Sequence, residues 1–283
     1  MDRFLTGRTA WVTGGASGMG KCIALALAEA GANVAIGSLL RRVGDEASER
    51  EFDEKLTVNL SENELEGAKD EIEAKGVRAL AMPLDVCSDE SVAESHGTIT
   101  GELGAIDILV NAAGTFMYHS YVANHPDYNW YHTINVNLHG PYRTTKHCLG
   151  GMIERKWGRV INLASTAANV GASDHAAYCA SKAGLLGLTR CVALEGAAHG
   201  VTCNAINPGF VATPQNLIRL EQKIRDEGLS TSVEECRQQL SGSYPQKRLI
   251  QPEEVAAVAL FLCRDEALGV AGEDITVAGG SVW

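Results

Sequence analysis

Short apolar runs alternate with longer amphipathic stretches along the chain, and this alternation predicts β-strands separated by α-helices. Strands are expected at residues 8–12, 33–36, 78–83, 106–110, 159–163, 201–206 and 274–277. Their nearly continuous apolar character is typical of parallel strands covered on both faces. Helices are expected between them, at 21–30, 64–75, 88–103, 130–155, from Tyr178 to about His199, and from Pro252 onward. The helix at 130–155 should be broken or bent near Gly140 and Pro141.

No break in composition and no internal repeat interrupts this alternation, so the chain is expected to be a single domain over residues 1–283. The pattern predicts an α/β fold with one doubly wound parallel sheet of about seven strands, of the Rossmann type. Two segments stand out. Residues 41–63 are charged and irregular, which indicates a surface excursion, and the polar, helical stretch 213–249 is expected to form a substrate lid.

A glycine-rich turn, Thr13-Gly-Gly-Ala-Ser-Gly-Met-Gly20, follows the first strand and opens a helix. Glycines let the backbone approach a pyrophosphate, and the amides at the start of the helix favour its charge. Strand, turn, helix and strand form the first unit of a dinucleotide-binding fold. The spacing Gly-x-x-x-Gly-x-Gly differs from the general Gly-x-Gly-x-x-Gly pattern, and a tight turn without a ligand is the alternative interpretation.

Tyr178 and Lys182 lie one turn apart on one face of the expected helix. An ammonium beside a phenol favours the phenolate and should lower the tyrosine pKa from about 10 towards the range of a proton-transfer catalyst. Tyr-x-x-x-Lys also arises by chance on an amphipathic helix. The glycine turn, residues 111–114, Ser165 and residues 208–209 all follow strand ends, however, and should converge on one crevice.

Composition narrows the class of protein. The net charge is 24 − 35 = −11 without a long basic run, which argues against nucleic acid or an anionic membrane as a partner. No apolar run is long enough to cross a bilayer, and the N-terminus lacks the apolar segment of a signal peptide. The eight cysteines are scattered, which favours a reduced, cytoplasmic location. No histidine spacing indicates a metal site.

With these features in place, the chain resembles the short-chain dehydrogenase/reductase family from about residue 7 to residue 280. The five segments that carry the resemblance are Thr13-Gly14-x-x-x-Gly18-x-Gly20, Asn111-Ala-Ala-Gly114, Asn137, Ser165 with Tyr178 and Lys182, and Pro208-Gly209-Phe-Val-Ala-Thr213. Asn111-Ala-Ala-Gly114 departs from the family's Asn-Asn-Ala-Gly at one position. Ser165 precedes Tyr178 by 13 residues, which is the family's usual spacing.

The resemblance implies an NAD(P)-dependent oxidoreductase that transfers a hydride reversibly between nicotinamide and a secondary alcohol or ketone. A sugar, polyol, hydroxy acid, 3-oxoacyl compound or steroid-like molecule would serve as substrate. Tyr178 would exchange the alcohol proton, Lys182 would lower the tyrosine pKa and bind the nicotinamide ribose, and Ser165 would hold the substrate oxygen. Asn137 would fix a water that links Lys182 to solvent. The family relation also suggests a homotetramer or homodimer.

By the same resemblance, the residues expected to bind the cofactor are Gly14, Ser17, Gly18, Met19, Gly20, Ser38, Arg41, Asp85, Val86, Asn111, Ala112, Gly114, Tyr178, Lys182, Pro208, Gly209, Val211 and Thr213. The second strand ends at Ser38 instead of the acidic residue that would favour NAD. A hydroxyl with guanidinium groups nearby can accept a 2′-phosphate, which favours NADP, whereas Ser17 lacks the basic side chain of many NADP-dependent relatives. NAD therefore remains the alternative cofactor. Asp85 and Val86 resemble the family's adenine contact, with a simple strand-end turn as the alternative.

The substrate pocket is expected to be walled by residues 116–119, 166–175 and 210–240. Arg219, Lys223 and Arg225 could meet an anionic group, although the solvated face of a lid helix is the more common role. Two other functions remain open on the same scaffold. One is an enzyme of another reaction class, and the other is a protein that binds the cofactor without turnover.

Overall fold

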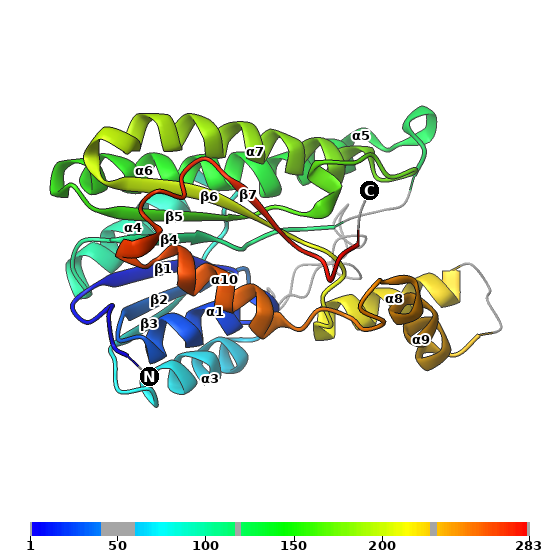
Figure 1. The fold of residues 1–283 in the computed structure, drawn as a ribbon, viewed down its shortest axis with the longest axis horizontal. Coiled ribbons are helices and arrows are strands. Elements are labelled where there is room, and N and C mark those ends of the chain that lie inside the picture. The colour runs from blue at the N-terminus through cyan, green and yellow to red at the C-terminus, as the bar shows by residue number, and fades with distance from the viewer. Residues whose placement is uncertain (1, 41–59, 117–119, 227–230, 282–283) are drawn as a thin grey trace.

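The computed structural model describes residues 2–40, 60–116, 120–226 and 231–281, and its strands form one parallel sheet (Figure 1). The strand order is β3-β2-β1-β4-β5-β6-β7. The strands are β1 (Thr9–Thr13), β2 (Asn33–Ser38), β3 (Ala79–Pro83), β4 (Ile108–Asn111), β5 (Gly158–Leu163), β6 (Val201–Pro208) and β7 (Asp274–Val277). The predicted doubly wound sheet is confirmed. Its order reverses between β1 and β4, where such sheets bind ligands beyond the carboxyl ends of the strands.

Helices cover both faces of the sheet. On one face lie α1 (Gly18–Glu29), α3 (Glu62–Glu73) and α10 (Pro252–Leu262), and on the other α4 (Asp89–Glu102), α6 (Gly140–Arg155) and α7 (Ala176–Gly196) (Figure 1). Because successive strand residues point to opposite faces, β1 divides its side chains between two cores. Val12 packs with Ile23 of α1, whereas Trp11 packs with Val92 of α4 and Met152 of α6. The continuous apolar runs of the sequence follow from this two-sided burial.

The helix expected at 130–155 is three consecutive segments. They are α5 (Asp127–Ile134), a π-helical turn over Asn135–His139, and α6. The irregularity therefore lies one turn before Gly140 and Pro141. Pro141 follows the π-helical turn directly, with helical backbone on both sides, so its missing amide hydrogen coincides with the irregularity in the helix. The helix expected to reach His199 ends as α7 at Gly196 and continues as a 3₁₀ turn over Ala197–His199.

The two unusual segments of the sequence border helices with defined caps. The expected excursion at 41–63 ends earlier than predicted, because α3 begins at Glu62 behind a capping box in which Ser61 and Glu64 bond reciprocally. Residues 41–59 lie outside the described part of the chain. Within the expected lid, α8 (Pro214–Asp226) and α9 (Val233–Ser243) form a pair that projects beyond the end of β6 (Figure 1).

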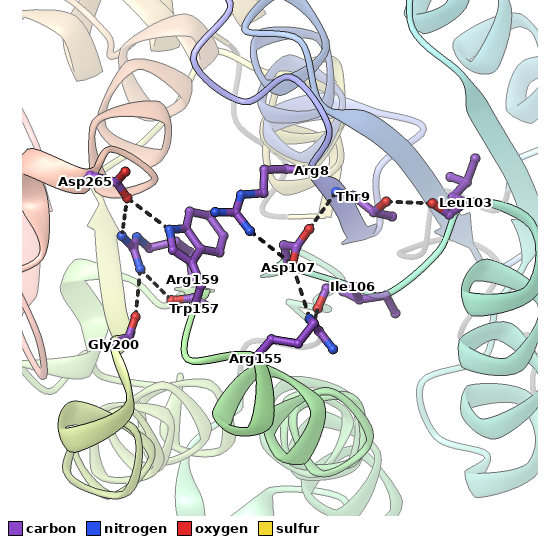
Figure 2. A network of polar contacts seen from close by, with 11 residues as sticks. Arg8, Thr9, Leu103, Ile106, Asp107, Arg155, Trp157, Arg159, Gly200 and Asp265 are labelled. Atoms are coloured by element: carbon purple, nitrogen blue, oxygen red, sulfur yellow. Dashed lines mark hydrogen bonds and ion pairs between the residues drawn. The ribbon is translucent and has the colours of Figure 1, made fainter.

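At the amino edge of the sheet, Asp107 joins the start of β1 to β4 and α6 (Figure 2). Its carboxylate accepts a hydrogen bond from the backbone N of Thr9 at 3.2 Å. The guanidinium groups of Arg8 and Arg155 each approach it at 3.6 Å. The carboxylate is only 9% exposed, so two cations balance one nearly buried anion.

Beside Asp107, the indole of Trp157 lies against two guanidinium groups (Figure 2). The central carbons of Arg8 and Arg159 lie 3.8 and 4.4 Å from the ring centroid. Asp265 accepts hydrogen bonds from Trp157 Nε1 at 3.0 Å and from Arg159 at 3.1 Å, and Gly200 O accepts another from Arg159 at 3.1 Å. These contacts connect β5 with the segments before β6 and after α10. The charged residues around Asp107 and Trp157 therefore hold the amino ends of the strands together.

Candidate active site

The glycine-rich turn is built from close backbone contacts that side chains would block. Gly14 has a φ of +64°, and a Cβ on it would lie 2.9 Å from the backbone of Ala113. A Cβ on Gly20 would lie 2.3 Å from the carbonyl oxygen of Gly14. The start of α1 therefore packs directly onto the turn. Ser17 makes no side-chain cap and the first helical turn carries no acidic residue, so nothing there repels a phosphate.

Ser38 and Asp85 lie at the carboxyl ends of β2 and β3, where the adenosine half of a dinucleotide was expected. Ser38 is 7% exposed, and its hydroxyl oxygen is buried with no hydrogen-bond partner among the described residues. A buried hydroxyl without a partner costs free energy unless a ligand satisfies it. Asp85 is exposed, and its Oδ1 accepts a hydrogen bond from Cys87 N at 2.8 Å, while Val86 is buried.

The side chain of Asn111 is bound inside the sheet. Thr144 donates to its Oδ1 at 2.6 Å, and its Nδ2 donates to Asn162 Oδ1 at 2.8 Å. These bonds connect β4, β5 and α6. The backbone beyond Asn111 is fixed beside the glycine turn, because both amides of residues 112–113 donate to Thr13 Oγ1 at 3.1 Å. The backbone of residues 112–113, and not the side chain of Asn111, is therefore placed to contact a ligand beside the turn.

Asn137, Gly114 and Lys182 come from three different elements and meet at one place. Asn137 is fully buried in the π-helical turn, where its Oδ1 accepts from Thr115 N at 2.8 Å. Its Nδ2 donates to Thr115 O at 2.8 Å and to Ser181 Oγ at 3.1 Å. A Cβ on Gly114 would lie 3.3 Å from Asn137 Oδ1 and 3.7 Å from Lys182 Nζ. Glycine thus keeps the space between the amide and the ammonium open.

The ammonium group of Lys182 is nearly enclosed. The residue is 6% exposed, and its Nζ donates to Leu163 O, at the end of β5, at 2.7 Å. Burial penalises the charged form and lowers the pKa of Lys182 to about 8. The group is still mostly charged at neutral pH. Its Nζ lies 5.7 Å from the centroid of the Tyr178 ring, which places the cation beside the expected proton donor.

Ser165 immediately follows β5 and is 9% exposed. Its Oγ accepts a hydrogen bond from Ala167 N at 3.1 Å, which starts the 3₁₀ turn Thr166–Ala168, and this turn packs against α7. The serine is thereby held near the first turns of the helix that carries Tyr178. Its hydroxyl hydrogen is available to a substrate oxygen, because the serine oxygen only accepts in the bond from Ala167 N.

An aromatic wall flanks Tyr178. The ring of Phe116 meets it edge-on, with centroids 4.7 Å apart, and lies 4.8 Å from the imidazole of His175. His175 is the N-cap residue of α7, and its Nδ1 contacts Asp174 Oδ1 and Ser173 O. Of the residues expected to wall the pocket at 116–119, Phe116 therefore lies beside Tyr178, while residues 117–119 lie outside the described part of the chain.

The Pro208-Gly209 segment ends β6 and leads into the lid. Gly209 N donates to Val277 O at 3.0 Å, and Phe210 N donates to Tyr244 Oη at 2.9 Å. Val211 and Thr213 are buried in the segment that follows the carboxyl end of β6. Because β1, β4, β5 and β6 are adjacent and parallel, their carboxyl ends lie side by side, and convergence of the segments that follow them on one crevice stays a prediction.

Four of the expected residues cannot be placed, and three others were not anticipated. Arg41 lies outside the described residues, as do the side chains of Arg219, Lys223 and Arg225 in the lid. Sequence reasoning missed Thr115 and Ser181, which bind Asn137, and the only available signal was that Ser181 precedes Lys182. It also missed Gln215, which contacts the glycine turn and is considered below.

The chemistry of these groups fits a dinucleotide. The glycine turn offers backbone amides to a pyrophosphate, the orphaned Ser38 hydroxyl lies at the ribose end, and Lys182 provides a cation at the other end. Among the described residues, no three His, Cys, Asp or Glu side chains gather as a metal site would require. The same part of the chain contains no helix with the length and apolar character needed to cross a membrane.

Comparison with known proteins gives matches over most of the chain or nearly all of it. A protein-family model described as enoyl-(acyl carrier protein) reductase matches residues 50–281. The chain is 36% identical to 3-oxoacyl-(acyl carrier protein) reductase FabG of Pseudomonas aeruginosa over 277 residues, which is 98% of each protein. It is 34% identical to D-beta-hydroxybutyrate dehydrogenase of Cupriavidus necator, covering 98% of this chain and 99% of that protein.

Solved structures agree with these relatives. Actinorhodin polyketide ketoreductase with NADPH superimposes with a TM-score of 0.85 at 31% identity, covering 99% of this chain and 98% of that one. NAD+-bound xylitol dehydrogenase superimposes with a TM-score of 0.84 at 28% identity, covering 98% and 99%.

Proposed function

The chain belongs to the short-chain dehydrogenase/reductase family, and on that premise we propose that it transfers a hydride reversibly between a nicotinamide cofactor and a secondary alcohol or ketone. One observation carries the proposal. The ammonium of Lys182 lies beside both the Tyr178 ring and the Gly114–Asn137 contact, at the edge of the sheet where the glycine turn lies. A proton-transfer group and a dinucleotide cradle therefore share one crevice.

Each catalytic side chain has a physical role in this proposal. Tyr178 Oη exchanges the proton of the substrate alcohol, and the Lys182 charge favours its phenolate. Ser165 donates its hydroxyl hydrogen to the substrate oxygen. Asn137 holds residues 114–115 against Lys182, and its expected water relay stays a prediction. When bound, nicotinamide supplies or accepts the hydride, while the protein contributes position and electrostatics.

The proposed cofactor site runs along the carboxyl edge of the sheet. Residues 14–20 would hold the pyrophosphate through backbone amides, and Ser38, Asp85 and Val86 would hold the adenosine half. The backbone of residues 112–114 would line the middle. The nicotinamide half would lie between Lys182 and the segment from Pro208 to Thr213.

Within this site we favour NADP over NAD because Ser38 replaces the acidic residue that binds the ribose 2′-hydroxyl. Fluorescence titration should give a lower Kd for NADPH than for NADH. In Ser38→Asp, the carboxylate should repel the 2′-phosphate and raise the Kd for NADPH by about tenfold or more, with little loss for NADH. A wild-type preference for NADH would reverse the assignment. Thr98→Asp, which adds the same charge at an exposed position of α4 away from the proposed site, serves as the control.

We propose a substrate whose carbonyl or hydroxyl carbon is β to a carboxyl derivative, since two full-length relatives are named for 3-oxoacyl and 3-hydroxybutyrate chemistry. The test follows absorbance of reduced nicotinamide with acetoacetyl thioesters, 3-hydroxybutyrate, xylitol and a cyclic ketone. Turnover should be highest with a β-substituted acid derivative. If turnover is highest with xylitol, the substrate class is a polyol and not a β-substituted acid derivative. Absence of turnover with every compound would contradict the oxidoreductase assignment.

We further propose that the protein is a homotetramer or homodimer assembled through α6, α7 and β7. Tyr142 on α6 is 51% exposed and Leu194 on α7 is 81% exposed, so both long helices present apolar side chains. Light scattering on the purified protein should give a mass of two or four chains, and a monomer at micromolar concentration would contradict this.

A cytoplasmic location is proposed from the eight free cysteines.

A further inference from the structure

Gln215 lies in the first turn of α8 and reaches back over the glycine turn. Its Oε1 would be 3.1 Å from a Cβ placed on Gly18, and Thr213 Cγ2 would be 3.6 Å from the same point. Gly18 itself opens α1. The side-chain amide of the lid helix therefore lies at the place where the turn presents its amides to a pyrophosphate.

The Gln215 amide oxygen is buried and has no hydrogen-bond partner among the described residues. An acceptor oxygen buried without a donor is costly, and exchanging the two ends of the amide would turn the Nε2 donors towards Gly18 instead. The neighbouring amide is satisfied within the protein, because Asn216 Nδ2 donates to Val211 O at 2.9 Å and Asn216 N donates to Thr213 Oγ1 at 3.2 Å. Two adjacent amide side chains thus have different roles, one closing the segment before α8 and the other facing the turn.

The glycine turn has no unpaired basic side chain of its own to bind a phosphate oxygen, so an additional N–H donor would strengthen phosphate binding there. Lys21, in the first turn of α1, is paired with Glu71 at 2.8 Å, and residues 14–20 contain no basic side chain. Phosphate oxygens there would be bound by backbone amides. A Gln side chain carries two N–H donors beside its oxygen, and rotation of the amide exchanges the two ends within the same space.

We propose that Gln215 is a cofactor ligand that donates from Nε2 to a pyrophosphate oxygen across Gly18 and so couples α8 to cofactor binding. This inference depends on the proposed function, because it requires a dinucleotide in the crevice. With the two ends of the amide exchanged, a pyrophosphate oxygen accepts from Nε2 beside Gly18, and the unpartnered Oε1 leaves that buried position. Cofactor binding therefore adds a hydrogen bond that holds the first turn of α8 on the glycine turn.

The test compares two ligands by calorimetry: ADP-ribose, which contains the pyrophosphate, and AMP, which does not. Gln215→Leu removes the donor with little change in size and should raise the Kd for ADP-ribose about tenfold. Gln215→Glu adds a negative charge beside the phosphates and should raise it further. The Kd for AMP should change less than about twofold in the Leu variant. Gln238→Leu, on the exposed side of α9 where Gln238 bonds to Glu234, is the matched control and should change neither.

Amide hydrogen exchange supplies a second measurement that does not depend on enzyme turnover. In the wild type, ADP-ribose should slow exchange in the first turns of α8, and in Gln215→Leu it should not. Wild-type-like ADP-ribose affinity in both Gln215 variants would overturn the inference while leaving the proposed function standing. Equal losses for AMP and ADP-ribose would also overturn it, since they would indicate a packing role. Failure of the wild type to bind ADP-ribose would remove the proposed function together with the inference.

Discussion

The ammonium of Lys182 occupies an environment that opposes its charge. It is almost fully buried and has a single protein acceptor among the described residues, the carbonyl oxygen of Leu163. The folded protein therefore bears a desolvation cost at a residue that the proposed chemistry requires. Such a cost is typical of a functional site, where a charge is kept for its effect on a neighbour.

The pKa of Lys182 makes this cost measurable as a pH dependence of stability. Burial lowers the pKa from 10.5 to about 8, so between these values the unfolded chain retains a proton that the folded protein has released. Stability rises with pH wherever the unfolded state binds more protons. Relative to Lys182→Met, the wild-type free energy of unfolding should rise between pH 8 and 10.5, by roughly 3 kcal/mol in all.

Urea denaturation of the cofactor-free protein across this range provides the measurement. Lys146→Met, at an exposed position of α6, is the control and should follow the wild-type curve. Curves that stay parallel for the wild type and Lys182→Met would show that the buried amine does not titrate in this range.

At the scale of single elements, α6 ends in an unfavourable backbone conformation. Its C-cap residue, Lys156, has φ 57° and ψ 32°, in the left-handed region that glycine adopts most easily. Lys156→Gly should relieve this strain and raise the free energy of unfolding by about 0.5–1 kcal/mol, as measured by thermal or urea denaturation. The matched change Lys146→Gly, inside the same helix, should lower it by about 1 kcal/mol. A loss of stability in Lys156→Gly would show that its side chain contributes more than the strain costs.

The sequence predicted elements well wherever local pattern decides the structure. Two-sided burial makes the strands apolar, and the glycine turn marks the start of α1. The π-helical turn could not be predicted in this way. It is accompanied by bonds from Asn137 to Thr115 and Ser181, which are 22 and 44 residues away along the chain. Contacts at such separations leave no periodic signal in the sequence.

The candidate site shows the same division between motif and environment. Tyr178, Lys182 and the glycine turn could be identified because their spacing is local. The burial of Lys182, the orphaned hydroxyl of Ser38 and the position of Gln215 over Gly18 depend on how distant segments pack. Composition and periodicity carry no information about those contacts.

For the molecule as a whole, the two edges of the sheet have separate tasks. The carboxyl ends of the strands carry the candidate active site. At their amino ends, the ion pairs and hydrogen bonds around Asp107 and Trp157 hold the strands and the neighbouring segments together (Figure 2). Asp107→Asn should leave Arg8 and Arg155 without their counter-charge and lower the free energy of unfolding by about 1–2 kcal/mol. The Kd for NADPH should stay within about twofold, since the change lies at the opposite edge of the sheet.

Asp89→Asn is the control for this prediction. Asp89 pairs with Arg143 at 2.9 Å, but its side chain is 85% exposed, so its loss should cost less than about 1 kcal/mol. Weaker NADPH binding in Asp107→Asn without any loss of stability would mean that the two edges of the sheet are not independent.

The most direct test of the account is a paired measurement on Tyr178→Phe, which removes only the phenolic hydroxyl beside Lys182. Steady-state turnover of the best substrate and the Kd for NADPH are measured on the same preparation. We expect turnover to fall by about a thousandfold or more, with the Kd within about threefold of the wild type. Retention of more than about a tenth of the wild-type rate would contradict the assignment of Tyr178 as the group that exchanges the substrate proton.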